Sequence, residues 1–327
     1  MALASGLAAQ FGCAEESTYG TGVTPTRFLE FNSEKMQVEV QTPESMGLRV
    51  TQRALRTDRF TRYISGGSGT VEFDVMNKGF GLIFKHCLGS NNITTVGTLP
   101  RLHTCNLADH GALNGLTVQI GKPDNTGTVR PWNFLGSKVT EWELTQELDD
   151  FLKLALTLDA RSLDKASPAL ASASYATSAS PYDSTQCVIQ IAGSTVPVRK
   201  FSLKQNNAVK TDRRFIQGSG LKSNPIPNDF VEITGEVEFE YTSNTAHDRI
   251  TSGTTAALTA TWTGALIEVS HNFSITISLP AVRFEGDDPQ VDGPDVVTQS
   301  YKFKALDDGS GATSPISLVY KTTDTTA

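Results

Sequence analysis

The chain has 327 residues, of which 38% are hydrophobic and 19% are charged, and its formal net charge is −7. This composition provides enough apolar material for one large or two ordinary packed domains and excludes wholesale disorder. The negative net charge argues against a general nucleic-acid binder, which needs a basic surface to replace phosphate counterions.

The cysteines and the first residues bear on the compartment in which the chain folds. Cys13, Cys87, Cys105 and Cys187 form no C-x-x-C pair, and four cysteines at this length do not indicate a disulfide framework. The N-terminus lacks a basic segment followed by a long apolar one, and no apolar run approaches the roughly 18 residues that cross a membrane. We therefore expect folding in a reducing cytoplasm, without membrane association.

Short strands are expected first, over residues 27–31 and 36–40. Residues 48–63 then carry a run of arginines, at Arg49, Arg53, Arg56, Arg59 and Arg62. Such a run can contact nucleic acid. A solvated face or a set of ion pairs between subunits is the favoured interpretation.

Residues 66–69, Gly-Gly-Ser-Gly, are expected to form a turn, and they lack the Lys-Ser/Thr tail of a phosphate-binding loop. The strand predicted over 70–75 follows. A helix is predicted over 77–88, because its apolar residues recur at helical spacing. Asn77 is the expected N-cap residue and Gly89 the expected C-terminal stop.

Residues 89–135 are rich in Gly, Asn, Pro and Thr and are expected to be mostly loop. They contain His103, Cys105 and His110, which are zinc-binding residue types, but the paired short spacings of zinc sites are missing. No Ser, His and acid stand in a recognisable nucleophile motif. The sequence therefore predicts no metal, no other cofactor and no enzymatic activity.

A hairpin is predicted over 139–144 and 151–160, where the second strand alternates leucines with other residues. Residues 165–181 are low in complexity, rich in Ala and Ser, and carry no periodic pattern. We interpret them as a linker between two halves or as an exposed loop.

The second half of the chain repeats the plan of the first. Thr57-Asp58-Arg59-Phe60 is echoed by Thr211-Asp212-Arg213-Arg214-Phe215, and Val71-Glu72-Phe73-Asp74 by Val237-Glu238-Phe239-Glu240. A short helix over 243–252 and a hairpin over 256–263 and 266–279 would follow, with Pro280 as its end. Further strands are expected over 299–305 and 316–320.

The order strand, Arg-rich strand, acidic strand, helix and hairpin therefore occurs twice, which favours an internal duplication. The predicted fold is mainly β, with packed antiparallel sheets in a sandwich or barrel and a flanking short helix. We divide the chain into a first β module over 1–164, a linker or loop over 165–186 and a second β module over 187–327.

The strand predicted over 231–241 presents four glutamates on one face, at Glu232, Glu236, Glu238 and Glu240. These carboxylates repel one another weakly where water and salt screen them. Two interpretations stay open. The face is either a solvated edge made acidic against aggregation, or the wall of a channel through which something anionic slides.

Several segments resemble the tail tube (major tail) proteins of phages with long non-contractile tails. The segments are Glu16–Thr21 with Val23–Phe31, Asn77–Ser90, Gly136–Leu144 and Leu279–Gly286. They span most of the chain, and their order is more specific than any one of them. Neither the cysteines nor residues 165–181 belong to the resemblance.

The resemblance implies a structural virion protein. Its subunits would join side by side into rings, with strands forming a continuous barrel around a lumen, and the rings would stack through loops and terminal arms. Such a tube guides genome DNA into the host and holds a tape-measure protein before ejection. Tail terminator and distal tail proteins would be further partners, and assembly would take place in the cytoplasm of the bacterial host.

The resemblance also implies an acidic lumen, which repels passing DNA. Two sets of residues are candidates, and the sequence does not choose between them: Glu72 and Asp74 with Glu236, Glu238 and Glu240, or Glu141 and Glu143. Basic residues expected at contacts between subunits are Arg53, Arg56, Arg59, Arg62, Arg213 and Arg214.

If each half is one tube module, three chains supply six modules, and we predict trimeric rings with pseudo-sixfold symmetry ahead of hexamers. The alternative function is a phage or bacterial β-sandwich that binds carbohydrate or a receptor. Such sites need surface aromatics or convergent polar groups, and the chain has only Trp132, Trp142 and Trp262. A hydrolase is a third option, but the adjacent Asp149 and Asp150 do not have the spacing of a glycosidase pair.

Overall fold

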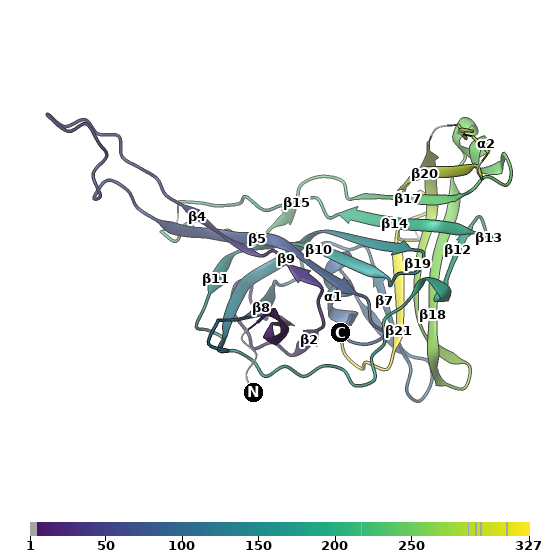
Figure 1. The fold of residues 1–327 in the computed structure, drawn as a ribbon, viewed down its shortest axis with the longest axis horizontal. Coiled ribbons are helices and arrows are strands. Elements are labelled where there is room, and N and C mark those ends of the chain that lie inside the picture. Colours follow the sequence, from purple (N-terminus) through teal and green to yellow (C-terminus); the bar gives the residue numbers. More distant parts are fainter. Residues whose placement is uncertain (1–4, 217, 287, 292, 295, 312) are drawn as a thin grey trace.

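The computed structural model describes residues 5–216, 218–286, 288–291, 293–294, 296–311 and 313–327. It is mainly β, with antiparallel sheets and few short helices, as the alternating sequence pattern predicts (Figure 1). Among the described residues of this one chain, no sheet closes into a barrel.

The first half of the chain begins with a 3-10 turn at Gly6–Ala8 and then forms eleven strands and one helix. These are β1 (Gln10–Glu15), β2 (Arg27–Leu29), β3 (Ser33–Glu34), β4 (Gln37–Gln41), β5 (Tyr63–Asp74), α1 (Gly81–Leu88), β6 (Asn92–Thr95), β7 (Arg101–Asn106), β8 (Leu116–Pro123), β9 (Val129–Glu147), β10 (Lys153–Ala160) and β11 (Ser162–Asp164).

The second half begins with a 3-10 turn at Ser184–Gln186 and forms ten strands and one helix. These are β12 (Cys187–Ile191), β13 (Ser194–Val196), β14 (Val198–Asn206), β15 (Val209–Lys210), β16 (Ile226–Pro227), β17 (Glu232–Glu240), α2 (Thr245–Ser252), β18 (Ala256–Glu268), β19 (His271–Glu285), β20 (Thr298–Ala305) and β21 (Ser317–Thr322).

One sheet runs through both halves, in the order β4–β5–β10–β9–β14–β17–β20–β19. We call it the main sheet. Its long strands β9 and β19 each leave it at one end. The first part of β9 pairs with β8 and β11, and the first part of β19 pairs with β18 and β21. These bent strands therefore carry the chain from the main sheet into the layers that cover it.

The inner side of the main sheet packs into one continuous core. Alternate residues of the strands point inward, as with Leu154, Leu156 and Leu158 of β10. Helix α1 lies beneath the sheet in the first half, and Phe80 just before it packs edge-on against Phe73 of β5, 6.0 Å between ring centroids. Burial of this apolar area drives the sheets and the helix together.

The two halves have the same strand order. The first half reads β2–β1–β8–β9–β10–β5–β4, and the second reads β13–β12–β18–β19–β20–β17–β14. A 3-10 turn precedes β1 in the first half and β12 in the second. Along the chain, α1 lies between β5 and β8, and α2 lies between the corresponding strands β17 and β18. This correspondence matches β9 and β10 with β19 and β20, not with β18 and β19 as the hairpin pattern in the sequence suggests.

Two glycines give this correspondence an independent check. A Cβ atom on Gly69 of β5 would lie 2.3 Å from the carbonyl oxygen of Lys35, and one on Gly235 of β17 would lie 2.3 Å from that of Ser202. Both strands therefore need glycine at the matching point, where the backbone of Lys35, between β3 and β4, or of Ser202 in β14 passes closest. The turn predicted at 66–69 is wrong, because these residues continue β5 and Gly69 is needed there for the close backbone contact.

Other boundaries also differ from the prediction. Helix α1 begins at Gly81 rather than at residue 77, after Phe80, whose side chain makes no capping hydrogen bond. Asn77 instead bonds to Ser180, with its Nδ2 2.9 Å from Oγ. The terminal Gly89 is confirmed, with a left-handed φ of 101°.

Two further expectations are wrong. Residues 89–135 hold β6, β7, β8 and the start of β9 rather than mostly loop. Strand β19 continues past Pro280, because the β18–β19 register shifts between Ala256 and Leu258 and the missing N–H of proline falls at that irregularity. Residues 165–181 are irregular, as predicted, but they lie along the first half, where Gln119 bonds to the backbone at Ala169 and Ala171.

Candidate functional site

The solvent side of the main sheet gathers charged side chains from six strands: β5, β10, β9, β14, β17 and β20. We call this side the charged face. Its carboxylates are Glu72, Asp74, Glu141, Glu143, Glu147, Glu232, Glu236, Glu238 and Glu240, and its ammonium groups are Lys153, Lys200, Lys204, Lys302 and Lys304. The carboxylates outnumber these lysines and Arg199, which contacts Glu240, taken together, so the face is acidic overall.

The pairing register explains why these side chains share one face. Thr157 of β10 is opposite both Thr70 of β5 and Glu141 of β9, and Asn206 of β14 is opposite both Glu141 and Glu232 of β17. Side chains of directly opposed residues point to the same side of a sheet. The two sets of acidic residues that the sequence kept apart therefore lie on the same surface.

Ion pairs occupy part of the charged face. Lys204 lies 2.8 Å from Glu141, Lys200 lies 2.8 Å from Glu147, and Lys304 forms a third pair with Glu232. The hydrogen bond that Lys204 donates to Glu141 raises the pKa of Lys204, and the one that Lys200 donates to Glu147 raises the pKa of Lys200. Both lysines are thus firmly charged at neutral pH.

Glu240 pairs with Arg199 at 2.8 Å, but other carboxylates on the charged face have no cationic partner within salt-bridge distance among the described residues. Glu143 and Glu238 are two of these, and Glu236 accepts a hydrogen bond from Ser300 instead. A polyanion approaching the face would meet these free carboxylates first. The arrangement can repel an anionic chain. Three of its five lysines form ion pairs with neighbouring glutamates, and Lys153 pairs with Asp150.

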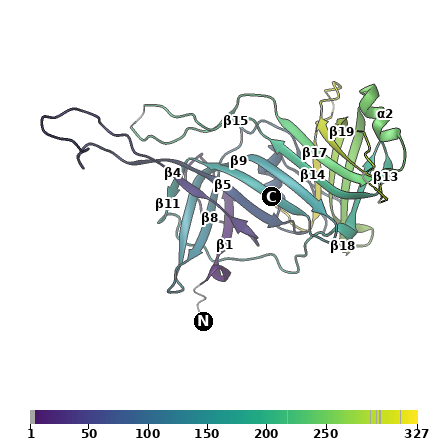
Figure 2. The ribbon, with the colours of Figure 1, turned by 45° about the horizontal axis from the view of Figure 1, so that its top comes forward.

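Two long loops extend from the same end of the molecule in both views (Figures 1 and 2). The first arm, residues 42–62, joins β4 to β5, and the second arm, residues 207–231, joins β14 to β17. Because β4 corresponds to β14 and β5 to β17, the arms occupy matching places in the two halves. The arginine run predicted as part of a strand lies in the irregular first arm.

All six predicted basic residues lie on the arms: Arg53, Arg56, Arg59 and Arg62 on the first, Arg213 and Arg214 on the second. Arg56 pairs with Asp58 at 2.8 Å, and Arg213 donates to the carbonyl oxygen of Asn224 at 2.6 Å. The first arm also exposes the apolar side chains of Met46, Leu48 and Val50.

The second arm is held down by a buried lysine that sequence reasoning missed. Lys222 is only 6% exposed, and its ammonium group contacts Asp159 of β10 and lies 2.9 Å from Glu39 of β4. Burial raises the pKa of Asp159 to about 6, against the opposing effect of Lys222. No signal in the sequence marks Lys222, because its partners are distant in the chain and polar loops are rich in lysine.

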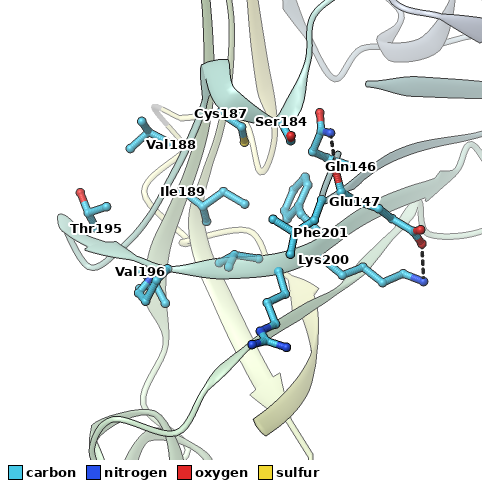
Figure 3. Close-up of a pocket in the computed structure, with 14 residues that line it drawn as sticks. Gln146, Glu147, Ser184, Cys187, Val188, Ile189, Thr195, Val196, Lys200 and Phe201 are labelled. Atoms are coloured by element: carbon cyan, nitrogen blue, oxygen red, sulfur yellow. Dashed lines mark hydrogen bonds and ion pairs between the residues drawn. The ribbon is translucent and has the colours of Figure 1, made fainter. Parts of the chain in front are cut away.

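A groove of about 230 Å³ lies where the two halves meet (Figure 3). Gln146, near the end of β9, and Leu148, just after it, form one wall, and the segment from Ser184 through β12 and β13 to β14 forms the other. Its lining is largely apolar, and burial raises the pKa of Cys187 to about 12, so this thiol stays protonated. The groove offers packing surface rather than a nucleophile.

The residues considered for other functions have structural roles. Trp142 and Trp262 are fully buried, and Trp132 is covered by the ammonium group of Lys165, 3.7 Å from its ring centroid. His103 and His110 are buried against backbone carbonyl groups. Within the described ranges, no three His, Cys, Asp or Glu side chains are placed to hold a metal ion.

Comparison with known proteins gives the family. The described residues contain no helix long and apolar enough to span a membrane. A search among curated proteins found no match. The sequence model of a family described as phage tail tube protein matches residues 6–305, nearly the whole chain. The chain therefore belongs to the phage tail tube protein family and is a structural component of the virion tail.

Proposed function

We propose that this chain assembles into rings that stack into the tail tube, and that the tube conducts genome DNA during ejection. The main sheet carries this proposal. It is continuous across both halves and presents a single charged face, which is the form expected of a segment of a tube wall. The opposite side is covered by the other strands and α1, so only one side is left to face a lumen.

The charged face would line the lumen. Its free carboxylates, among them Glu143 and Glu238, would repel phosphate groups and keep DNA from binding during passage. Three of the lysines that interrupt the acidic surface are paired with Glu141, Glu147 and Glu232, so these three offer phosphate little attraction. An extended tape-measure protein would occupy the same channel before ejection.

We propose modules over 1–164 and 187–327 that arose by duplication, with 165–186 between them; residues 1–4 lie outside the described ranges. The repeated strand order and the matching glycines support this division. Three chains would then supply six modules to each ring. Closing the ring would also remove open sheet edges, which otherwise invite aggregation.

The two arms would contact neighbouring subunits and stacked rings, with their arginines in ion pairs across these contacts. Terminal rings would meet the tail terminator and distal tail proteins. Assembly would take place in the cytoplasm of the bacterial host, in keeping with four cysteines that are all free thiols.

Electron microscopy of the purified protein tests the proposal. We expect stacked rings with a central channel, and averages along the tube axis with threefold symmetry. Six chains in each ring would overturn the trimer, and compact monomers at every concentration and salt would count against self-assembly.

A charge variant tests the lumen. Tubes of the Glu143→Lys/Glu238→Lys double variant should retain short double-stranded DNA, with an affinity that falls steeply as salt rises. Tubes of the wild type and of an Asp307→Lys control, which lies off the charged face, should not. Equal retention by all three would place the charged face elsewhere than in the lumen.

A further inference from the structure

The two halves are joined inside the chain by a strand pairing. Strand β14 of the second half pairs with the last part of β9 of the first, from Lys200 opposite Glu147 to Asn206 opposite Glu141. Two ion pairs cross this joint, Lys200 with Glu147 and Lys204 with Glu141. The groove of about 230 Å³ lies beside this joint, where Gln146 and Leu148 face β12 and β14.

The repeated strand order assigns a counterpart to each side of this joint. Strand β4 corresponds to β14, and β19 corresponds to β9. Thr157 of β10 and Lys302 of β20 correspond, because each is opposite the residue that follows the matching glycine, Thr70 or Glu236. Thr157 is also opposite Glu141, and Lys302 is also opposite Glu285, so Glu285 takes the place of Glu141.

The same reasoning fixes the residue on β4. Lys35 and Ser202 correspond through the glycines opposite them. Glu39 and Asn206 each lie four residues further on, so Glu39 takes the place of Asn206.

Both counterpart edges are open in a single chain. Strand β4 pairs only with β5 among the described strands, and Lys35 donates its backbone N–H to Thr70 at 2.8 Å. Because N–H groups alternate in direction along a strand, that of Val38 points away from β5. Strand β18 accompanies β19 only as far as Val282, which leaves Arg283–Glu285 with β20 on one side and, within the described part of the chain, no strand on the other.

The groove has a counterpart as well. In the first half, Leu7, Ala9 and Phe31 line an open hollow of about 720 Å³, next to the 3-10 turn that precedes β1. It lacks the wall that Gln146 and Leu148 supply in the second half. Val291, after β19, is 74% exposed. It lies six residues beyond Glu285, as Glu147 at the end of β9 lies six residues beyond Glu141, so Val291 is the counterpart of Glu147.

We propose that the joint between chains copies the joint within the chain. The open edge of β4 in one chain adds to residues 283–286 of a second copy, with Glu39 opposite Glu285, and residues 288–291 after β19 cover the hollow beside Leu7. The contact is head to tail, so it closes into a ring when the rotation per chain allows it. This inference rests on the proposed tube function and names the surfaces that would build it.

A disulfide placed across the joint tests the proposed register. Directly opposed residues on paired antiparallel strands have Cα atoms about 4.5–5.5 Å apart, within the range that a disulfide spans. Tubes of the Glu39→Cys/Glu285→Cys variant, once oxidised, should give covalent dimers and trimers on a non-reducing gel. The Asn206→Cys/Glu141→Cys variant is the matched control, because its disulfide forms within one chain and leaves the band monomeric.

A proline variant tests the edge separately. Val38→Pro removes an N–H that points away from β5, so the monomer should fold and melt within about 2 °C of the wild type while tube formation is lost. Thr95→Pro is its control. The N–H of Val96, just after β6, donates to the carbonyl oxygen of Pro100, just before the paired strand β7. The N–H of the preceding Thr95 therefore points the other way, outward from the edge strand β6. This variant should still form tubes.

The outcomes separate the inference from the proposed function. If wild-type tubes form, the internal control cross-links, and the Glu39/Glu285 pair does not, the joint is wrong and the tube function stands. Tubes of Val38→Pro at the wild-type yield would overturn the joint in the same way. If the wild type forms neither rings nor tubes, the proposed function fails and the joint fails with it.

Discussion

The two halves share a strand order but differ in what fills the space beneath the main sheet. In the first half α1 is embedded in the core, and seven of its eight residues are buried. In the second half α2 is polar, and of its residues Ile250 packs partly against the core. Strand order depends on backbone pairing, which tolerates many side chains, whereas the burial of a helix depends on its own apolar stripe. The same strand order can therefore be covered by a buried apolar helix in one half and by a polar helix in the other.

The largest expected effect comes from removing an aromatic ring of α1. Phe84 is 1% exposed and lies 5.9 Å from Phe80 and 5.4 Å from Tyr320, measured between ring centroids. Phe84→Ala should lower the free energy of unfolding by about 3–5 kcal/mol. Ile250→Ala in α2 should cost less than about 1 kcal/mol. Denaturant unfolding measures both free energies, and equal losses would contradict the difference in burial between α1 and α2.

The next largest effect should be the same in both halves. Gly69→Ala and Gly235→Ala each place a Cβ 2.3 Å from a backbone carbonyl oxygen, which cannot move without separating two strands. Each should lower the free energy of unfolding by about 2–3 kcal/mol. Gly6→Ala, where a Cβ meets nothing within 4 Å, is the neutral control. A large loss at one glycine and none at the other would break the structural equivalence of the halves.

A third effect separates the two arms. Lys222→Met removes the cation that holds the second arm, and the first arm shows no such buried lysine in the described part of the chain. Hydrogen exchange should rise over residues 210–225, and the free energy of unfolding should fall by about 2 kcal/mol above pH 7. Lys210→Met, which changes an exposed ion pair with Asp212, should change neither.

The pH dependence of this loss follows from Asp159. Its folded pKa of about 6 lies above the usual value, so folding binds a proton between about pH 4 and 6, and stability falls as pH rises through that window. Without Lys222 the ionised carboxylate is costlier still. The deficit of Lys222→Met should therefore be smallest near pH 4 and grow toward pH 7, and a deficit independent of pH would contradict this account.

The smallest effect sharpens the contrast at α1. The ring of His86, with Nε2 3.6 Å from the Glu15 carboxylate, and the hydrogen bond that Lys85 donates to that carboxylate lower the pKa of Glu15 to about 2. A lowered pKa stabilises the fold above about pH 4.5, and that stability is lost as pH falls toward 2. After allowance for solvent screening, Glu15→Gln should cost about 1 kcal/mol at pH 7 and nothing near pH 2.

Acid titrations of the unfolding transition measure this difference. Glu147→Gln, which removes an exposed pair with Lys200, is the control and should shift the curve much less.

Much of the fold could be predicted from local pattern. Period-two alternation located β10, β17 and β20, and helical spacing located α1, because these signals depend only on which side chains face a core. The prediction failed at residues 66–69 and at Pro280. Glycine and proline usually interrupt a strand, but here a close strand crossing and a register shift accommodate them.

The sequence by itself determined a mainly β protein with two similar halves, a family resemblance and an acidic set of strand residues. It could not combine Glu72, Glu143 and Glu238 into one face, because they lie on strands brought together only by pairing over long separations. The buried contact of Lys222 with Asp159 and Glu39 was decided in the same way. Local sequence pattern indicates which side of a strand faces solvent, whereas only the tertiary structure decides which strands are neighbours and what a loop covers.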